Sequence, residues 1–318
     1  MKIPLRRAVE VTLVLAVSGG CGGERASCDW CGTVVIATAG EAGTLFPPNA
    51  RTQIDNGLID LVFQRLAEIG PQLNTIGDSG FTPALARSWS FDDPRTIRFT
   101  LNEKARWHDG VPVTAEDVAF TFDVYRDTLL SPTAMARIGR IESVTALDER
   151  TVVAQFREQY AEQFFDAVYH MRILPRHLLD SIPRERLASH PFGRRPIGSG
   201  PYRFVRWEAA QFVELAADSS FSLGRPGIPR IIWRFTPDLN TALTQLLAGE
   251  VDILEFLGGP DNIRRVAEND RLRVIMYPTL YYGYLAFNLR DPDRPERPNP
   301  LFADRRLRRA IAMGVDRK

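Results

Sequence analysis

The sequence is poor in the residue types on which metal and redox sites depend. It has three cysteines and four histidines in 318 residues, and a closed zinc site takes several such ligands. No HExxH motif and no nucleophile–base pair is visible, which disfavours hydrolytic chemistry. The net charge of +1 gives no bulk attraction to nucleic acid or to an anionic membrane. Beyond the N-terminus no run of about 18 apolar residues occurs, so no membrane-spanning helix is predicted.

The N-terminus has the layout of a secretory signal peptide. Basic residues precede the apolar run Val11–Val17, and small residues lead to Cys21. This ending resembles a bacterial lipoprotein processing site, which implies a signal peptide over residues 1–21 and lipidation of Cys21. A tether over residues 22–32 follows and contains Cys28 and Cys31. This pair is compatible with a structural role, a local disulfide or half of a metal site.

The stretch from residue 85 to residue 125 reads as a strand, a tight turn and a capped helix. Apolar and polar residues alternate over Arg95–Leu101, the period of a half-buried strand. Asp109-Gly110 is a turn dipeptide because glycine tolerates positive φ. Thr114 and Asp117 have the spacing of a capping box, and the apolar residues of Val118–Tyr125 follow at helical spacing.

These residues carry a family resemblance. The matching segments are Leu85-Ala86, Ser88-Trp89, Trp107-His108-Asp109-Gly110, Pro112-Val113-Thr114-Ala115, Glu116-Asp117-Val118 and the turn Pro196-Ile197-Gly198-Ser199-Gly200-Pro201-Tyr202. Together they resemble the signature of the family 5 extracellular solute-binding proteins, the dipeptide-, oligopeptide- and nickel-binding receptors of ABC importers. The glycine-rich turn lacks the Gly-Lys-Ser/Thr of a P-loop, so phosphate binding is not predicted.

The resemblance implies an α/β fold, a type II periplasmic-binding-protein-like lobe with a mixed sheet and an inserted subdomain. A chain of this length holds about two domains. Segments 33–54 and 196–285 are expected to form the first lobe, 55–195 its inserted subdomain, and 286–318 the hinge and the start of a truncated second lobe. The second lobe would be mostly missing, because family members continue beyond this point.

Local patterns predict the remaining elements. Strands are expected at Thr33–Thr38, Val144–Leu147, Thr151–Phe156, Tyr202–Trp207, Phe212–Leu215, Ile231–Phe235 and Val251–Ile253, and an extended segment at Leu272–Leu289. Helices are expected at Ile54–Leu66, Ala161–Val168, His177–Ser181, Thr241–Ala248, from a cap at Asp261 to Glu268, and around Arg305–Ile311, with a loop over Arg184–Arg195. The strand–helix–strand order near residue 240 indicates parallel strands.

The function implied by the resemblance is capture of a peptide or similar small solute outside the membrane, without catalysis and without a cofactor. Its partners would be the solute, the membrane permease subunits of an ABC transporter and, through Cys21, the membrane, but not nucleic acid. The protein would reside in the periplasm or on the outer face of the bacterial cell membrane. We expect the cleft where the loop Thr38–Phe46 converges with Tyr281–Asn288. The expected ligand-binding residues are Ala42, Gly43, Thr44, Leu45, Phe46, Tyr281, Tyr282 and Asn288.

Two other readings stay open. The chain could be a truncated lipoprotein remnant that binds no ligand. Alternatively, it could be a metal-dependent hydrolase in which His108 and Asp109 form half of a metal site completed by Asp55 or Asp117. The sequence does not identify the solute, which could be a peptide, a nickel complex or a sugar.

Overall fold

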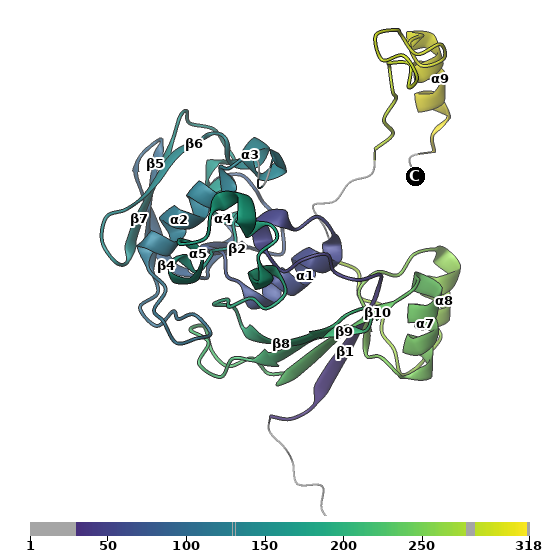
Figure 1. The fold of residues 1–318 in the computed structure, drawn as a ribbon. Coiled ribbons are helices and arrows are strands. Elements are labelled where there is room, and N and C mark those ends of the chain that lie inside the picture. The colour runs from purple at the N-terminus through teal and green to yellow at the C-terminus, as the bar shows by residue number, and fades with distance from the viewer. Residues whose placement is uncertain (1–29, 129, 131, 278–283, 317–318) are drawn as a thin grey trace, which may run out of the picture.

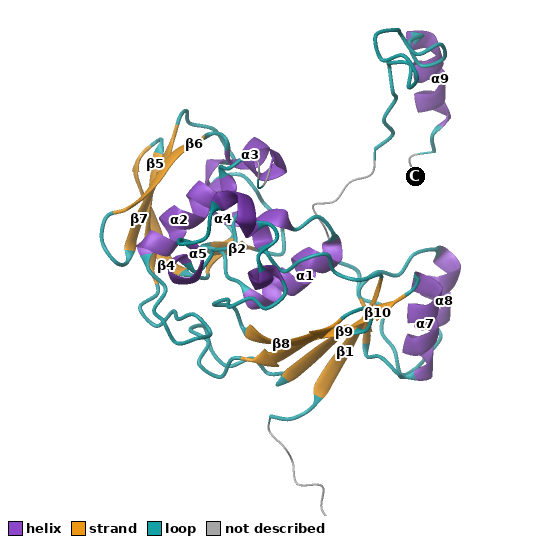
Figure 2. Ribbon diagram, viewed as in Figure 1, coloured by secondary structure: helices purple, strands orange, loops and turns teal. Residues whose placement is uncertain are grey.

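A mixed five-stranded sheet is the largest sheet of the computed structural model (Figure 1, Figure 2). The structure describes residues 30–128, 130, 132–277 and 284–316. The strands are β1 (Thr33–Ala39), β8 (Tyr202–Glu208), β9 (Phe212–Ala217), β10 (Arg230–Thr236) and β11 (Ile253–Leu254), in the order β11-β1-β10-β9-β8. β1 is parallel to β10 and β11, whereas β9 is antiparallel to β8 and β10. These pairings confirm the predicted α/β class with a mixed sheet.

The two faces of this sheet pack into two separate cores. Along β1, Ile36 contacts the core that includes Trp233 of β10, while Ala37 belongs to the core on the other face. Neighbouring residues point to opposite faces because the side-chain period of a strand is two. The covering helices are α1 (Gln53–Val62) on the first face, and α7 (Leu239–Ala248) and α8 (Pro260–Ala267) on the second. The order β10–α7–β11 with parallel strands confirms the predicted strand–helix–strand unit.

A four-stranded antiparallel sheet forms a second layered unit within residues 86–156. Its strands are β4 (Ala86–Asp93), β5 (Thr96–Leu101), β6 (Ile141–Ala146) and β7 (Thr151–Phe156), in the order β4-β5-β7-β6. The predicted alternation of β5 is confirmed: Ile97, Phe99 and Leu101 are all 0% exposed. A short ribbon of β2 (Ala67–Ile69) and β3 (Phe81–Pro83) lies nearby in the sequence.

Helix α2 (Ala115–Tyr125) packs on this sheet and starts as predicted. Asp117 accepts hydrogen bonds from the Thr114 backbone N–H at 2.8 Å and from the Thr114 hydroxyl at 3.1 Å, which closes the capping box. The other helices of this region are α3 (Pro132–Ile138), α4 (Gln163–Tyr169) and α5 (Arg176–Leu179). Of these, α3 was not predicted from the sequence.

Tertiary contacts shorten one predicted helix and create another. Helix α1 ends at Val62 rather than at Leu66, because the carbonyls of residues 64–66 accept hydrogen bonds from distant backbone N–H groups, those of residues 173, 85 and 86. The predicted loop Arg184–Arg195 contains helix α6 (Arg184–Leu187) and a 3-10 turn at Pro191–Gly193. Its Leu187 is buried in the core, which stabilises a turn that the polar sequence did not indicate.

The last part of the chain differs from expectation in two details. Gly259, not Asp261, is the N-cap of α8, and Asp261 lies in its first turn in an ion pair with Arg264. Residues 272–277 and 284–289 form no strand. Helix α9 (Arg305–Gly314) is present as predicted, and Asp304 caps it by accepting a hydrogen bond from the Arg306 N–H. None of its residues is buried.

Candidate functional site

Helix α1 carries a polar face on the side opposite to its buried apolar residues. Its apolar residues Leu58, Ile59 and Val62 are buried. Positions three and four apart share a face of a helix, so the opposite face carries Gln53, Asn56, Gly57 and Asp60. The face is polar and only partly covered, so its side chains can contact a ligand.

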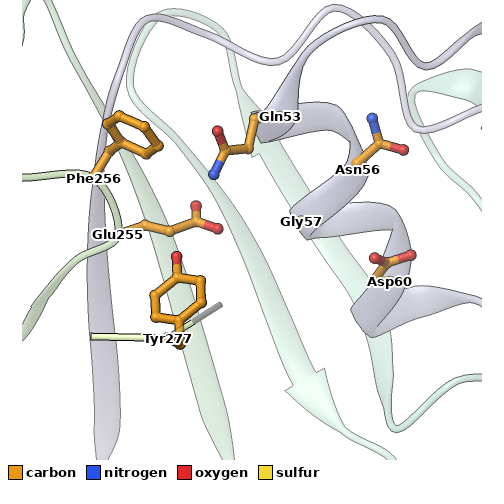
Figure 3. A pocket seen from close by; sticks show the side chains of 7 residues that line it. All are labelled: Gln53, Asn56, Gly57, Asp60, Glu255, Phe256 and Tyr277. Carbon is orange, nitrogen blue, oxygen red and sulfur yellow. The ribbon is translucent and has the colours of Figure 1, made fainter. Parts of the chain in front are cut away.

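This polar face forms one wall of a pocket of about 340 Å³. The opposite wall comes from Glu255 and Phe256, which directly follow β11, and from Tyr277 (Figure 3). We call this cavity the α1 pocket. Since β1, β10 and β11 are parallel, the pocket lies beyond the carboxyl end of a parallel strand, which is where ligands bind in open α/β sheets.

Gly57 leaves room at the centre of the α1 wall. A Cβ placed there would lie 2.9 Å from the Trp233 ring and 4.0 Å from a carboxylate oxygen of Glu255. The buried Trp233 ring therefore packs against bare helix backbone. Any larger residue at position 57 would push against this ring and into the pocket.

Two arginines neutralise Asp60 at one end of the pocket. Arg65 Nη2 lies 2.9 Å and Arg172 Nη2 2.8 Å from its carboxylate. Arg65 also pairs with Glu68 at 3.2 Å and stacks its guanidinium over the Tyr169 ring. Burial raises the pKa of Glu68, and the charge of Arg65 partly offsets this shift. The negative charges of Asp60 and Glu68 are therefore balanced by the positive charges of Arg65 and Arg172.

Glu255 has a different environment. Its carboxylate points toward Gln53 across the pocket (Figure 3), and among the described residues it forms no ion pair. Burial raises the pKa of Glu255, and a hydrogen bond from the Gln53 side chain partly offsets this effect. The site therefore carries one carboxylate whose charge no neighbouring side chain balances.

The predicted ligand-binding loop is held to α1 by a buried carboxylate. Asp55, 1% exposed, accepts hydrogen bonds from the Gly43 N–H at 2.7 Å and from the Arg51 and Thr52 N–H groups at 3.0 Å each. In return the Asp55 N–H donates to the Thr52 hydroxyl. The N–H of Gly43 is thus already used inside the protein.

The side chains of that loop divide into buried and accessible ones. Ala42, Leu45 and Phe46 are buried in the core, whereas Gly43 is exposed and Thr44 is intermediate. A ligand could therefore meet this loop mainly through its backbone near Gly43.

The second predicted set of ligand-binding residues is described only in part. Tyr281 and Tyr282 lie outside the described residues. Asn288 is exposed, and its side-chain oxygen accepts a hydrogen bond from the Arg290 N–H at 3.1 Å. The expected convergence of these residues with the loop before α1 stays a prediction.

His108, a candidate metal ligand, joins two segments that carry the family resemblance. Its Nε2 lies 2.9 Å from the Gly200 carbonyl oxygen, and its Nδ1 lies 3.3 Å from the Gly198 nitrogen. These contacts fit a neutral ring with the proton on Nε2. Burial lowers the pKa of His108, and the Gly200 carbonyl opposes that shift. The histidine therefore positions the glycine-rich turn.

That turn passes very close to the end of α1. A Cβ at Gly198 would lie 1.8 Å from the Val62 carbonyl oxygen, and one at Gly200 would lie 2.6 Å from that of Leu61. The Gly200 N–H donates to the Val62 carbonyl at 2.8 Å. Both glycines are needed for this approach.

The other residues of the hypothetical hydrolase site each have a separate structural role. Asp109 pairs with His177 at 2.8 Å. Asp117 caps α2 and accepts a hydrogen bond from the Arg176 N–H, and Asp55 caps α1. Within the part of the chain that the structure describes, no three His, Cys, Asp or Glu side chains are placed to bind a metal ion. The structure thus does not bring His108, Asp109, Asp55 and Asp117 together.

The predictions for the N-terminus fall almost wholly outside the described residues. Cys21 and Cys28 are not among them, while Cys31 is exposed. Over the described ranges, none of the helices has the length and apolar character that a membrane span requires. Lipidation and the pairing of the cysteines remain predictions.

Comparison with known families settles the relationship. The family model of the bacterial extracellular solute-binding proteins, family 5 Middle, matches residues 80–318. The chain belongs to this family. The match includes β5, the capped α2, the glycine-rich turn and the β10–α7–β11 unit, so the resemblance read from the sequence is confirmed.

Individual relatives agree with this assignment. A Brucella ovis protein named as an ABC transporter peptide-binding protein is 32% identical over 246 residues, which cover 77% of this chain and 43% of the relative. The structure of the oligopeptide-binding protein AppA from Bacillus subtilis with a nonapeptide has a TM-score of 0.63 and 26% identity, covering 70% of this chain and 44% of AppA. NikZ from Campylobacter jejuni with Ni(L-His) has a TM-score of 0.63 and 26% identity, covering 75% and 45%. The chain thus spans about half the length of these relatives.

The residues of the α1 pocket were not predicted as a site. The signal for one wall was partly present, because Asn56, Gly57 and Asp60 lie opposite the apolar stripe of the predicted helix Ile54–Leu66, although Gln53 lies before it. The sequence also places Glu255 just after a predicted strand. That these two walls meet depends on the packing of α1 on the sheet, which no local pattern reveals.

Proposed function

We propose that this protein is the extracytoplasmic substrate-binding component of an ABC importer, capturing peptides or similar small solutes and delivering them to the membrane permease subunits. Family membership and the peptide-binding relatives support this function. The proposal places the protein in the periplasm or on the outer face of the bacterial membrane, anchored through a lipid on Cys21. It includes no catalytic step.

The observation that carries the proposal is the α1 pocket beyond the end of β11. It combines an aromatic wall, Phe256 and Tyr277, with polar groups on α1. Such mixed lining is typical of small-molecule sites, in which apolar area supplies affinity and polar groups supply orientation. Backbone groups near Gly43 and the residues Tyr281, Tyr282 and Asn288 would add contacts from the edge of the cleft.

In the proposed mechanism, segments 33–54 and 196–285 form one lobe, and 286–318 lead through a hinge into a second. A solute that touches both lobes stabilises the closed state, because it gains contacts there that the open state lacks. Extended peptides can be bound through strand-like backbone hydrogen bonds, which tolerate different side chains.

Thermal-shift measurement with a panel of solutes tests the proposal. Dipeptides, oligopeptides, nickel complexes and sugars are added to the 318-residue chain, and a bound solute raises Tm as its concentration exceeds Kd. We expect a shift with at least one peptide. If no solute of the panel stabilises the chain, the receptor function is refuted and the non-binding remnant is favoured.

A matched pair of variants locates the binding. Asn56→Trp fills the α1 pocket, whereas Asn262→Trp adds the same ring on α8, outside it. Both asparagines donate a side-chain hydrogen bond to the carbonyl four residues earlier, at 2.8 Å and 3.0 Å, so each exchange removes an equivalent interaction. We expect Asn56→Trp to abolish the ligand-induced shift and Asn262→Trp to retain it. Retention by both would place the solute elsewhere.

A further inference from the structure

The charges around the α1 pocket leave one carboxylate uncompensated. Asp60 contacts Arg65 and Arg172, and Glu68 contacts Arg65, so this end of the pocket is neutral overall. Glu255, on the opposite wall, has only the Gln53 amide as a side-chain partner among the groups that influence its titration. Together with Arg65, Arg172 and Glu68, the pocket lining therefore has a net charge of one negative unit when Glu255 is ionised.

The surroundings of Glu255 favour binding of a positively charged ligand group. Its carboxylate is partly buried, and burial raises its pKa, which shows that water solvates the charge incompletely. Phe256, 55% exposed, presents a ring in the same wall. A cation can pair with a carboxylate and lie against an aromatic face at the same time.

The neutral amide of Gln53 faces the carboxylate of Glu255. Gln53 lies in the first turn of α1 and donates to Glu255 across the pocket (Figure 3). A carboxylate oriented in this way keeps lone pairs that can accept hydrogen bonds from a second donor. The cavity of about 340 Å³ next to it has room for an alkylammonium or guanidinium group.

We infer that Glu255 is a specificity-determining residue that binds an organic cation, an ammonium or guanidinium group, of the solute in the α1 pocket. This inference rests on the proposed receptor function and adds to it the class of solute. The cation can come from the amino terminus of a peptide or from a lysine or arginine side chain. In both cases the cation would form an ion pair with Glu255 and pack against the face of the Phe256 ring.

Isothermal titration calorimetry at pH 7.5 and low salt tests the inference with three peptide amides. The probes are N-acetyl-tetraalanine amide, which is neutral, tetraalanine amide with a free amino terminus, and N-acetyl-Ala-Ala-Lys-Ala amide. The proteins are the unmodified chain, Glu255→Gln and the control Glu268→Gln, which removes an exposed glutamate outside the pocket. We expect at least one cationic probe to bind about tenfold or more tightly than the neutral one, since hydrogen bonds between charged groups contribute about 1.5–3 kcal/mol.

The variants decide whether Glu255 is responsible. Glu255→Gln should remove the preference for the cation, so that its three Kd values become similar to one another, and Glu268→Gln should keep the preference. Which of the two cationic probes gains affinity identifies the source of the cation. Equal binding of all three probes, or a preference that survives Glu255→Gln, overturns the inference but leaves the receptor function standing. Failure of every probe to bind the unmodified chain overturns the inference, and the thermal-shift panel then decides the receptor function.

Discussion

Replacing Asp55 by alanine should loosen the start of α1 together with the loop before it. The Asp55 carboxylate accepts three backbone hydrogen bonds of 3.0 Å or less, from Gly43, Arg51 and Thr52. A fourth contact, to Thr44, is long at 3.4 Å. One side chain thus connects the helix to a loop twelve residues earlier in the sequence.

The size of the effect follows from these three bonds. Each should contribute about 1–1.5 kcal/mol net, because the acceptor is ionised while the donors regain some water in the variant. Loss of the cap at Thr52 is part of the same sum, since Asp55 supplies half of the capping box. We therefore expect Asp55→Ala to lower the free energy of unfolding by about 3–4.5 kcal/mol, and the nearly isosteric Asp55→Asn by at least half of that.

Urea unfolding monitored by circular dichroism measures this loss through the midpoint and the slope m. Asp123→Ala is the matched control, because Asp123 is an exposed residue on α2, and it should change stability by no more than about 0.5 kcal/mol. Hydrogen exchange should show faster exchange at the amides of Gly43, Arg51 and Thr52 in the Asp55 variants. A loss below about 1 kcal/mol for Asp55→Ala, or unchanged exchange at these amides, would refute the reasoning.

Two further perturbations test the glycine-rich turn. Burial lowers the pKa of His108 in the folded protein below its ordinary value of 6.5. The neutral ring therefore makes its full contribution to the free energy of unfolding above pH 6.5, and this contribution is lost as the pH falls from 6.5 toward the folded-state pKa. The free energy of unfolding measured in urea should therefore fall more steeply between pH 7 and pH 5 in the unmodified chain than in His108→Gln, by at most about 1.4 kcal/mol per pH unit. Parallel curves for the two proteins would contradict this. Gly198→Ala should cost about 3 kcal/mol or more, because its Cβ would meet a backbone carbonyl at 1.8 Å; Gly227→Ala, with open space around it, should be nearly neutral, and equal stability of the two variants would argue against the close approach.

Much of the fold was predictable because local pattern and tertiary structure agree. The alternation over Arg95–Leu101 and the capping residues Thr114 and Asp117 reappear as β5 and the start of α2. Where tertiary contacts compete with a local pattern, the prediction failed. The helical spacing continues to Leu66, but the backbone of residues 64–66 is hydrogen-bonded to other segments and cannot remain in the helix.

The candidate site was less predictable than the fold. Its walls come from α1 and from the segment after β11, about 200 residues apart in the sequence, and neither has an unusual composition. His108, a candidate metal ligand from the sequence, has a structural role instead, because its ring contacts the backbone of Gly198 and Gly200. Chemically suggestive residues can thus be scaffold, while ordinary glutamines and glutamates line the cavity.

The central position of β1 has a consequence for the order of events during synthesis. β1 leaves the ribosome among the first elements, yet both of its neighbours, β10 and β11, are translated about 200 residues later. Until then it has no strand to pair with, and closing so long a loop is slow. The five-stranded sheet can therefore be completed only after residue 254 has emerged, and β1 stays an unpaired apolar strand until the residues of β10 have been translated.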